Sequence, residues 1–352
     1  MNKQRLWVIV IYTLVIASLS SIGGCGRQRI NSESQVALVW PSPPEVPRIR
    51  FVKTVHHPTD LDIHENIFVR FVNYLRGKKE ISIVSPYGVN MDKEGRFYVV
   101  DTYLKQAHVF DLSDNSHHYF PGKGESLLSP IDIAIDDIRG RIYLSDSKKG
   151  IVYIYSKDKL EQRGEIKFSG ISRPTGLSIN SITKELLVVD SEKSKIFRIG
   201  LKDHNMKGII GGEGAEEGMF HAPTHIFTTP DGRIYVSDSL NFRVQIFSPH
   251  GEFIRSIGVA GDSPGTFSRP KGVAVDSDGN IYVVDALFDN IQVFDKDGRL
   301  LLAFGGPGHD FGKFWLPSGI YIDKDDYIFI SDTYNRRVQV FQYLTREVSL
   351  KR

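Results

Sequence analysis

The residues best suited to chemistry are six aspartates that recur about every 46 residues along the chain. Carboxylates at one position of a repeat could converge on a common axis and hold a cation. Alternatively, each could cap its own loop by accepting backbone N–H bonds, or pair with an arginine of its own repeat. A structural requirement produces one aspartate in every repeat, so we expect a structural role. The six are Asp101, Asp146, Asp190, Asp238, Asp285 and Asp332.

Histidines could make a metal-dependent enzyme if several of them met at one centre. The sequence offers no such set, because His56–His57 and His117–His118 are adjacent pairs outside the expected inner strands and His225 stands alone. No serine nucleophile elbow with a histidine partner is recognisable either. We therefore expect no catalytic residues, no metal and no cofactor, and we interpret His225 as a histidine whose hydrogen bonds are satisfied.

The first 25 residues have the layout of a secretory signal that ends in the only cysteine. Lys3 and Arg5 precede an apolar run from Leu6 to Leu19. This run is shorter than the about 20 residues of a membrane-spanning helix. The alternatives to a cleaved signal are an uncleaved anchor and a signal without modification. We expect residues 1–24 to be a targeting segment.

The end of this segment, from Ile22 to Cys25, resembles a bacterial lipobox, in which cleavage precedes the cysteine and the thiol carries lipid. The resemblance implies lipidation of Cys25 and attachment to a membrane of the bacterial cell envelope. Because Gly26 rather than aspartate follows, the outer membrane is favoured in a diderm organism. Residues 25–47 are polar and then rich in proline, which predicts an extended spacer.

A repeat of about 46 residues dominates the rest of the chain. Six prolines mark it, at 86, 130, 174, 223, 270 and 317. Each proline begins a similar sequence segment, and the clearest copy of this segment runs from Arg269 to Gly306. In that copy we expect short strands at Val273–Val275, Ile281–Val284, Ile291–Phe294 and Leu300–Phe304. Four strands in each of six repeats predict an all-β, six-bladed propeller with blades starting near 85, 129, 173, 222, 269 and 316.

The two ends of the repeat region indicate how the ring closes. The sixth repeat supplies only three strands before a short polar tail, which would leave an unpaired sheet edge. The lone strand-like segment 48–55 is the expected partner, so the propeller domain should span residues 48–345. Between this strand and blade one, Phe68, Phe71, Val72 and Leu75 have helical spacing and predict one short helix near 65–76.

The residues 238–247 and 332–341 share the pattern Asp-x-x-Asn-x-Arg-Val-Gln followed by apolar residues, which resembles the NHL repeat. The resemblance covers about 85–342, although the second and third repeats keep the aspartate and lose Asn-x-Arg. The proline-rich spacer with the following Pro-Arg-Ile-Arg also resembles bacterial NHL lipoproteins with a six-bladed propeller. Relatives of this wider family bind proteins or RNA and some are enzymes, so the resemblance leaves function open.

One face of the expected propeller concentrates residues that suit recognition. The loops between the second and third strands of blades one, four, five and six carry aromatic residues and arginines, which binding surfaces favour. The alternative is that the aromatics pack between loops and that the arginines pair with the blade aspartates. The candidate binding residues are Tyr103, Phe242, Arg243, Phe288, Tyr334 and Arg337.

The charge of the chain limits its partners. Lys and Arg number 44 against 42 for Asp and Glu, and both surplus cations lie in the signal segment. A neutral mature chain argues against nucleic acid as a partner. We therefore expect a lipid-anchored, non-enzymatic module that binds a protein of the cell envelope. The alternatives are a glycan-binding propeller and a propeller lyase or hydrolase with a metal in its channel.

Overall fold

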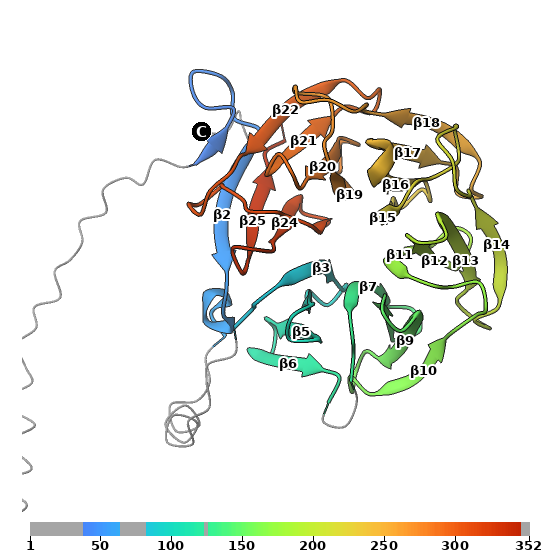
Figure 1. The fold of residues 1–352 in the computed structure, drawn as a ribbon. Coiled ribbons are helices and arrows are strands. Elements are labelled where there is room, and N and C mark those ends of the chain that lie inside the picture. The colour runs from blue at the N-terminus through green and yellow to red at the C-terminus, as the bar shows by residue number, and fades with distance from the viewer. Residues whose placement is uncertain (1–37, 64–81, 123–125, 346–352) are drawn as a thin grey trace, which may run out of the picture. The chain divides into compact units, whose positions relative to one another are not determined.

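The computed structural model describes residues 38–63, 82–122 and 126–345, and the structural statements below concern these residues. The signal segment, Cys25 and the helix expected near 65–76 lie outside them. Figure 1 shows six β-sheets arranged as blades around a common axis, with successive blades following one another around the ring. The six-bladed, all-β propeller expected from the repeat is thus confirmed.

Five of the blades are four-stranded antiparallel sheets whose strands follow in sequence order from the axis outwards. Blade one holds β3 (Pro86–Met91), β4 (Phe97–Asp101), β5 (Gln106–Asp111) and β6 (Ser116–Phe120). Blade two holds β7 (Pro130–Asp136), β8 (Arg141–Asp146), β9 (Ile151–Ser156) and β10 (Gln162–Ile166). Blade three holds β11 (Pro174–Asn180), β12 (Glu185–Asp190), β13 (Lys195–Gly200) and β14 (Met206–Ile210).

Blades four and five repeat the same order. Blade four holds β15 (Pro223–Thr228), β16 (Ile234–Asp238), β17 (Arg243–Phe247) and β18 (Phe253–Ile257), with the short 3-10 helix η2 (Ser239–Asn241) between its second and third strands. Blade five holds β19 (Pro270–Val275), β20 (Ile281–Asp285), β21 (Asn290–Phe294) and β22 (Leu300–Gly305). In blades one to five the repeat proline therefore begins the inner strand.

The sixth blade is closed by the N-terminal part of the chain. Its inner strands are β23 (Ile320–Ile322), β24 (Tyr327–Asp332) and β25 (Arg337–Tyr343). Strand β2 (Ile49–Val55) pairs antiparallel with β25, from Ile49 opposite Tyr343 to Val55 opposite Val338. A 3-10 helix, η1 (Pro58–Leu61), follows β2. The missing fourth strand is thus supplied by the segment that the sequence indicated.

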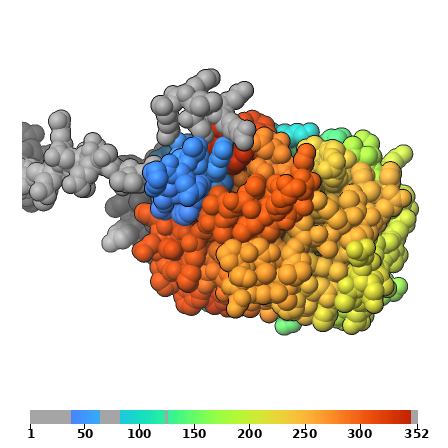
Figure 2. Space-filling view, turned by 90° about the horizontal axis from the view of Figure 1, so that it is seen from above, coloured from blue at the N-terminus to red at the C-terminus, as the bar shows by residue number. Residues whose placement is uncertain are grey.

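The last residues of the expected spacer are folded onto blade six. Strand β1 (Val39–Trp40) pairs with β2 and adds a fifth strand to blade six. The Trp40 ring packs 5.6 Å from Phe304 and 5.7 Å from Phe341, measured between ring centroids. Figure 2 shows this N-terminal segment in blue against the orange surface of the last blades. Trp40 packs on the apolar surface formed by Phe304 and Phe341. Residues 38–47 therefore belong to the folded domain rather than to a spacer.

The core lies between the blades, because each sheet is covered on both faces by its neighbours. All five residues of β20 are buried, whereas in the outermost strand β22 only Phe304 is buried and Leu301 and Ala303 are exposed. The inner strands approach one another closely: a Cβ added at Gly319 would lie 2.1 Å from the carbonyl oxygen of Tyr87. This tight packing holds the ends of the inner strands, and the loops attached to them, in fixed positions. Among the described residues no helix is long and apolar enough to cross a membrane.

Candidate binding face and central channel

The six blade aspartates end the second strand of each blade, and all are fully buried. Asp101 accepts backbone N–H bonds from Val84 and Ser85 on one oxygen and from Tyr103 and Leu104 on the other, at 2.7 to 3.1 Å. The aspartates of blades two, three and five accept backbone N–H bonds from the preceding linker and the following loop in the same way. Each carboxylate therefore fastens the linker that enters its blade to the following loop.

In blades four and six an arginine completes this arrangement. Arg337 donates from Nε to Asp332 at 2.7 Å and from a terminal nitrogen to two backbone carbonyls. Arg243 does the same with Asp238 at 2.9 Å. Asn335 also donates to Asp332. Both arginines thus pair with the aspartate of their own blade. This is the structural role that the sequence left open as the alternative to partner binding.

We call the side of the propeller that carries the loops between second and third strands the b–c face. At one position of these loops, two residues after the blade aspartate, four blades carry an exposed apolar side chain. Their exposed fractions are 71% for Tyr103, 37% for Leu240, 54% for Leu287 and 56% for Tyr334. In the remaining blades, two and three, the same position holds the exposed charged residues Lys148 and Glu192.

Trp315, in the linker before blade six, extends this surface. It is 45% exposed and packs against Tyr334 with ring centroids 5.4 Å apart. The ring of His309 meets the other side of the indole at 5.2 Å. Together, Tyr103, Leu240, Leu287, Trp315 and Tyr334 form what we call the apolar arc, which runs over the contiguous blades four, five, six and one.

Two of the candidate aromatic residues do not belong to this surface. Phe242 is half-buried and packs against the core between blades four and five, and Phe288 is half-buried as well. Leu240 and Leu287 lie in the same two loops and are more exposed. Their residue type gave no signal, because leucine is common in protein cores, and only their position in the loop marks them. Counting two residues from each blade aspartate would have found them.

At the axis, side chains from opposite blades meet. The rings of His225 in β15 and Tyr87 in β3 are stacked with centroids 5.5 Å apart and planes 17° apart. Because blades four and one face each other across a six-bladed ring, this contact spans the channel. Neither ring nitrogen of His225 has a hydrogen-bond partner within the described chain, so the interpretation of His225 as satisfied is wrong. Burial and the nearby charge of Lys271 lower the pKa of His225 to about 3.

Below this contact the channel opens into a cavity of about 370 Å³ on the face opposite the b–c face. Inner strands of all six blades line it, and Asp132 of β7 lies at its wall together with His225. The Asp132 carboxylate accepts backbone N–H bonds from Leu177 and Ile133, both at 2.9 Å. Burial nevertheless raises the pKa of Asp132 to about 7.

Asp132 should make stability depend on pH. Its pKa is raised from 3.8 to about 7 in the folded protein, so the unfolded chain loses this proton first as the pH rises. Folding stability should therefore fall between pH 4 and pH 7, by up to roughly 4 kcal/mol at about 1.4 kcal/mol per unit. Urea unfolding of Asp132→Asn should lack this component. An unchanged slope in the variant would show that Asp132 does not cause the pH dependence.

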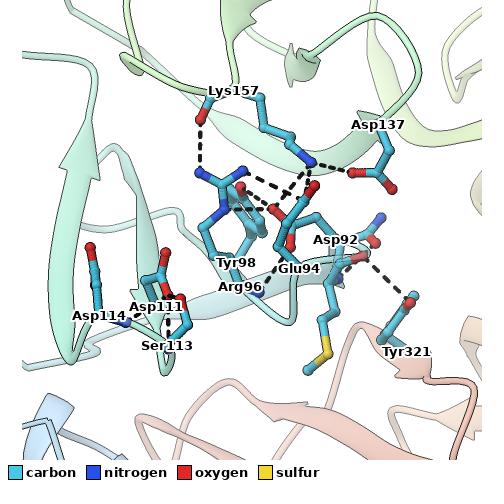
Figure 3. A network of polar contacts seen from close by, with 12 residues as sticks. Asp92, Glu94, Arg96, Tyr98, Asp111, Ser113, Asp114, Asp137, Lys157 and Tyr321 are labelled. Atoms are coloured by element: carbon cyan, nitrogen blue, oxygen red, sulfur yellow. Dashed lines mark hydrogen bonds and ion pairs between the residues drawn. The ribbon is translucent and has the colours of Figure 1, made fainter.

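A carboxylate cluster between blades one and two is occupied by the protein's own cations. Oxygens of Asp92, Glu94 and Asp137 lie within 4.8 Å of one another. Figure 3 shows Lys157 reaching into this cluster, where its ammonium pairs with Glu94 and Asp137. Arg96 donates to Asp92 at 2.7 Å. The cluster is an ion-pair network that ties two blades together.

Residues 261–265 read Gly-Asp-Ser-Pro-Gly, which matches a hydrolase motif by letters alone. That motif needs a strand-to-helix turn, whereas these residues form the linker between β18 and β19. The backbone N–H of Ser263 is bound to Thr266 at 3.1 Å, in an exposed turn. This segment therefore does not present a nucleophile elbow.

With this architecture the chain is a six-bladed β-propeller. Residues 215–291 match the family model described as a 6-bladed beta-propeller, and residues 314–341 match the model of the NHL repeat. The last blade thus contains an NHL repeat, as its Asp-x-x-Asn-x-Arg pattern indicated.

Known structures share this fold at low sequence identity. An auxiliary nutrient binding protein from Bacteroides thetaiotaomicron superposes with a TM-score of 0.61 at 12% identity, over 84% of this chain and 76% of that one. A protein of unknown function from the same organism gives a TM-score of 0.58 at 17% identity, over 74% and 70%. Virginiamycin B lyase from Staphylococcus aureus gives 0.55 at 14%, over 74% and 96%. These likenesses show the fold alone.

A curated relative shares a shorter stretch. The chloroplastic protein Suppressor of Quenching 1 of Arabidopsis thaliana is 23% identical over an alignment of 157 residues that covers 36% of this chain. The match spans only 15% of that protein.

Proposed function

We propose that this propeller is a lipid-anchored, non-enzymatic module of the bacterial cell envelope that binds a protein partner through the apolar arc. The observation that carries the proposal is the set of exposed apolar side chains at one loop position in blades one, four, five and six. Contiguous exposed apolar groups are typical of interaction sites. The test is whether replacing arc residues abolishes partner binding while the melting temperature stays unchanged.

The fold itself does not require apolar residues at this position. Blades two and three place Lys148 and Glu192 there and still form complete sheets with a capped loop. Leu240 and Leu287 therefore expose apolar surface without contributing a packing role that the repeat demands. Aromatic residues such as Tyr334 and Trp315 are the anchors that protein interfaces favour, since they bury a large area at low entropic cost.

The sequence of the signal segment supports the anchor. Lipidation of Cys25 would hold the propeller at a membrane surface, where several acyl chains give lasting attachment. In a diderm organism the residue after Cys25 favours the outer membrane. In the sequence, Cys25 precedes the described part of the folded domain, which begins at residue 38.

The anchor is tested by Cys25→Ser. This variant should remain unprocessed and should not incorporate labelled fatty acid, because the thiol that receives the lipid is missing. Gel mobility and radiolabelling of whole cells measure both effects. Persistent labelling of the variant would contradict lipidation at this position.

Experiments can distinguish protein binding from two other functions, enzyme catalysis and glycan binding. A propeller enzyme would need a metal or convergent acid–base groups in the channel, and metal analysis of the purified protein detects the former. A glycan-binding propeller would be stabilised by soluble cell-wall sugars, which a melting experiment detects. The protein-binding proposal predicts neither a stoichiometric metal nor stabilisation by sugars.

A further inference from the structure

The residues that flank the six repeat prolines carry a net positive charge. Each proline begins or precedes an inner strand, so its neighbours lie around the channel at its b–c end. Of these twelve neighbours three are basic and none is acidic. The three basic residues are Arg173, Arg269 and Lys271. Topology therefore places a group of cations around the mouth of the channel.

These cations have no carboxylate partners. Within residues 38–63, 82–122 and 126–345, none of the three forms an ion pair, although Lys157, Arg243 and others do. The Lys271 ammonium instead lies over the ring of Tyr87, 5.1 Å from its centroid. Burial and the neighbouring charge of Arg269 lower the pKa of Lys271 to about 8. A half-buried cation with another cation nearby is an unfavourable arrangement that an anion would relieve.

The unpartnered histidine is an independent observation next to these cations, because it stacks on Tyr87, over whose ring Lys271 lies, and it also lines the cavity on the opposite side. His225 is 6% exposed, its ring is stacked on Tyr87, and both ring nitrogens lack a hydrogen-bond partner in the described chain. Buried polar atoms without partners are rare in proteins, so these two nitrogens are available to a ligand or to water. Asp132, a carboxyl group that lines the cavity together with His225, already accepts two backbone N–H bonds.

We propose that the b–c mouth of the central channel is a binding site for a small oxyanion, a carboxylate or a phosphate, held by Lys271, Arg173 and Arg269 above His225. An oxyanion at this point would offset part of the charge of the three cations, and one of its oxygens would accept the N–H of the imidazole. Guanidinium groups suit this task because they present paired donors to carboxylate and phosphate alike. The site is separate from the apolar arc and does not depend on a protein partner.

The experiment compares citrate and inorganic phosphate with sodium chloride at equal ionic strength, at about 10 mM anion, by thermal unfolding. The wild-type protein should melt at a higher temperature in citrate, in phosphate or in both. Lys271→Met and Arg269→Ala should each lose at least about tenfold in affinity for the anion that binds. Lys296→Met, on the opposite face, is the matched control and should respond as the wild type does.

The two probes distinguish the anion classes, since a response to citrate alone indicates a carboxylate site and a response to phosphate alone a phosphate site. A second measurement uses histidine NMR, in which the bound anion should raise the pKa of His225. Equal stabilisation of all four proteins would reveal a general salt effect and overturn the proposal. The absence of any response in the wild type would overturn it as well.

Discussion

Removal of residues 26–56 should destabilise the propeller by at least about 3 kcal/mol, because it strips the outer strands from blade six. Ile49 and Val55 of β2 are fully buried, and burying one such side chain contributes about 1.5 to 3 kcal/mol. The deletion also leaves the backbone groups of β25 unpaired along the register from Val338 to Tyr343. Urea unfolding of the purified variants measures the loss.

Two shorter deletions serve as controls. Removing residues 26–37 takes away only expected spacer and should leave the unfolding midpoint unchanged. Removing residues 26–45 also takes away Trp40, which packs against Phe304 and Phe341, and should give an intermediate loss. If all three variants unfold at the same urea concentration, β2 does not close the ring.

Substitutions in the apolar arc should abolish partner binding without unfolding the protein. Leu287→Glu with Tyr334→Ala removes two exposed side chains, so the melting temperature should stay within a few degrees. As interface anchors, each could contribute about 2 kcal/mol, or roughly 30-fold in affinity. Partner capture from solubilised membranes should therefore fall below detection for the double variant.

The matched control for the arc lies on the opposite face. Ile138, in the turn between β7 and β8, is 75% exposed, so Ile138→Glu makes a similar change at a similar exposure. This variant should capture the partner as the wild type does. A large loss of melting temperature in the arc variant with undiminished capture would show that the arc is packing surface rather than a binding site.

Much of the fold could be predicted because the repeat imposes the same local chemistry in every blade. The proline that opens each inner strand and the aspartate that ends each second strand lie at fixed positions, and the structure shows why. The carboxylates of Asp101 and its counterparts fasten linker and loop together. Closure by β2 was predictable as well, since a missing strand leaves an edge that only one nearby segment could cover.

Features that depend on contacts between distant segments were not predictable. Trp40 looked like part of a proline-rich spacer, and only the apolar rim formed by Phe304 and Phe341 gives it a place to pack. Phe242 and Leu240 lie two residues apart in one loop, and the loop conformation decides that the leucine is the more exposed. His225 offered no sequence signal, because its stacking on Tyr87 across the channel joins segments that are distant in the sequence.

The measurement that tests the binding function most directly is site-specific photocrosslinking in the native cell. A photoreactive amino acid at position 240 or 287, within the apolar arc, should crosslink to one and the same envelope protein. The same probe at position 138, on the opposite face, should give no such product. Crosslinks to that protein from position 138 alone, or none from the arc although other evidence shows a bound partner, would contradict the proposed binding face.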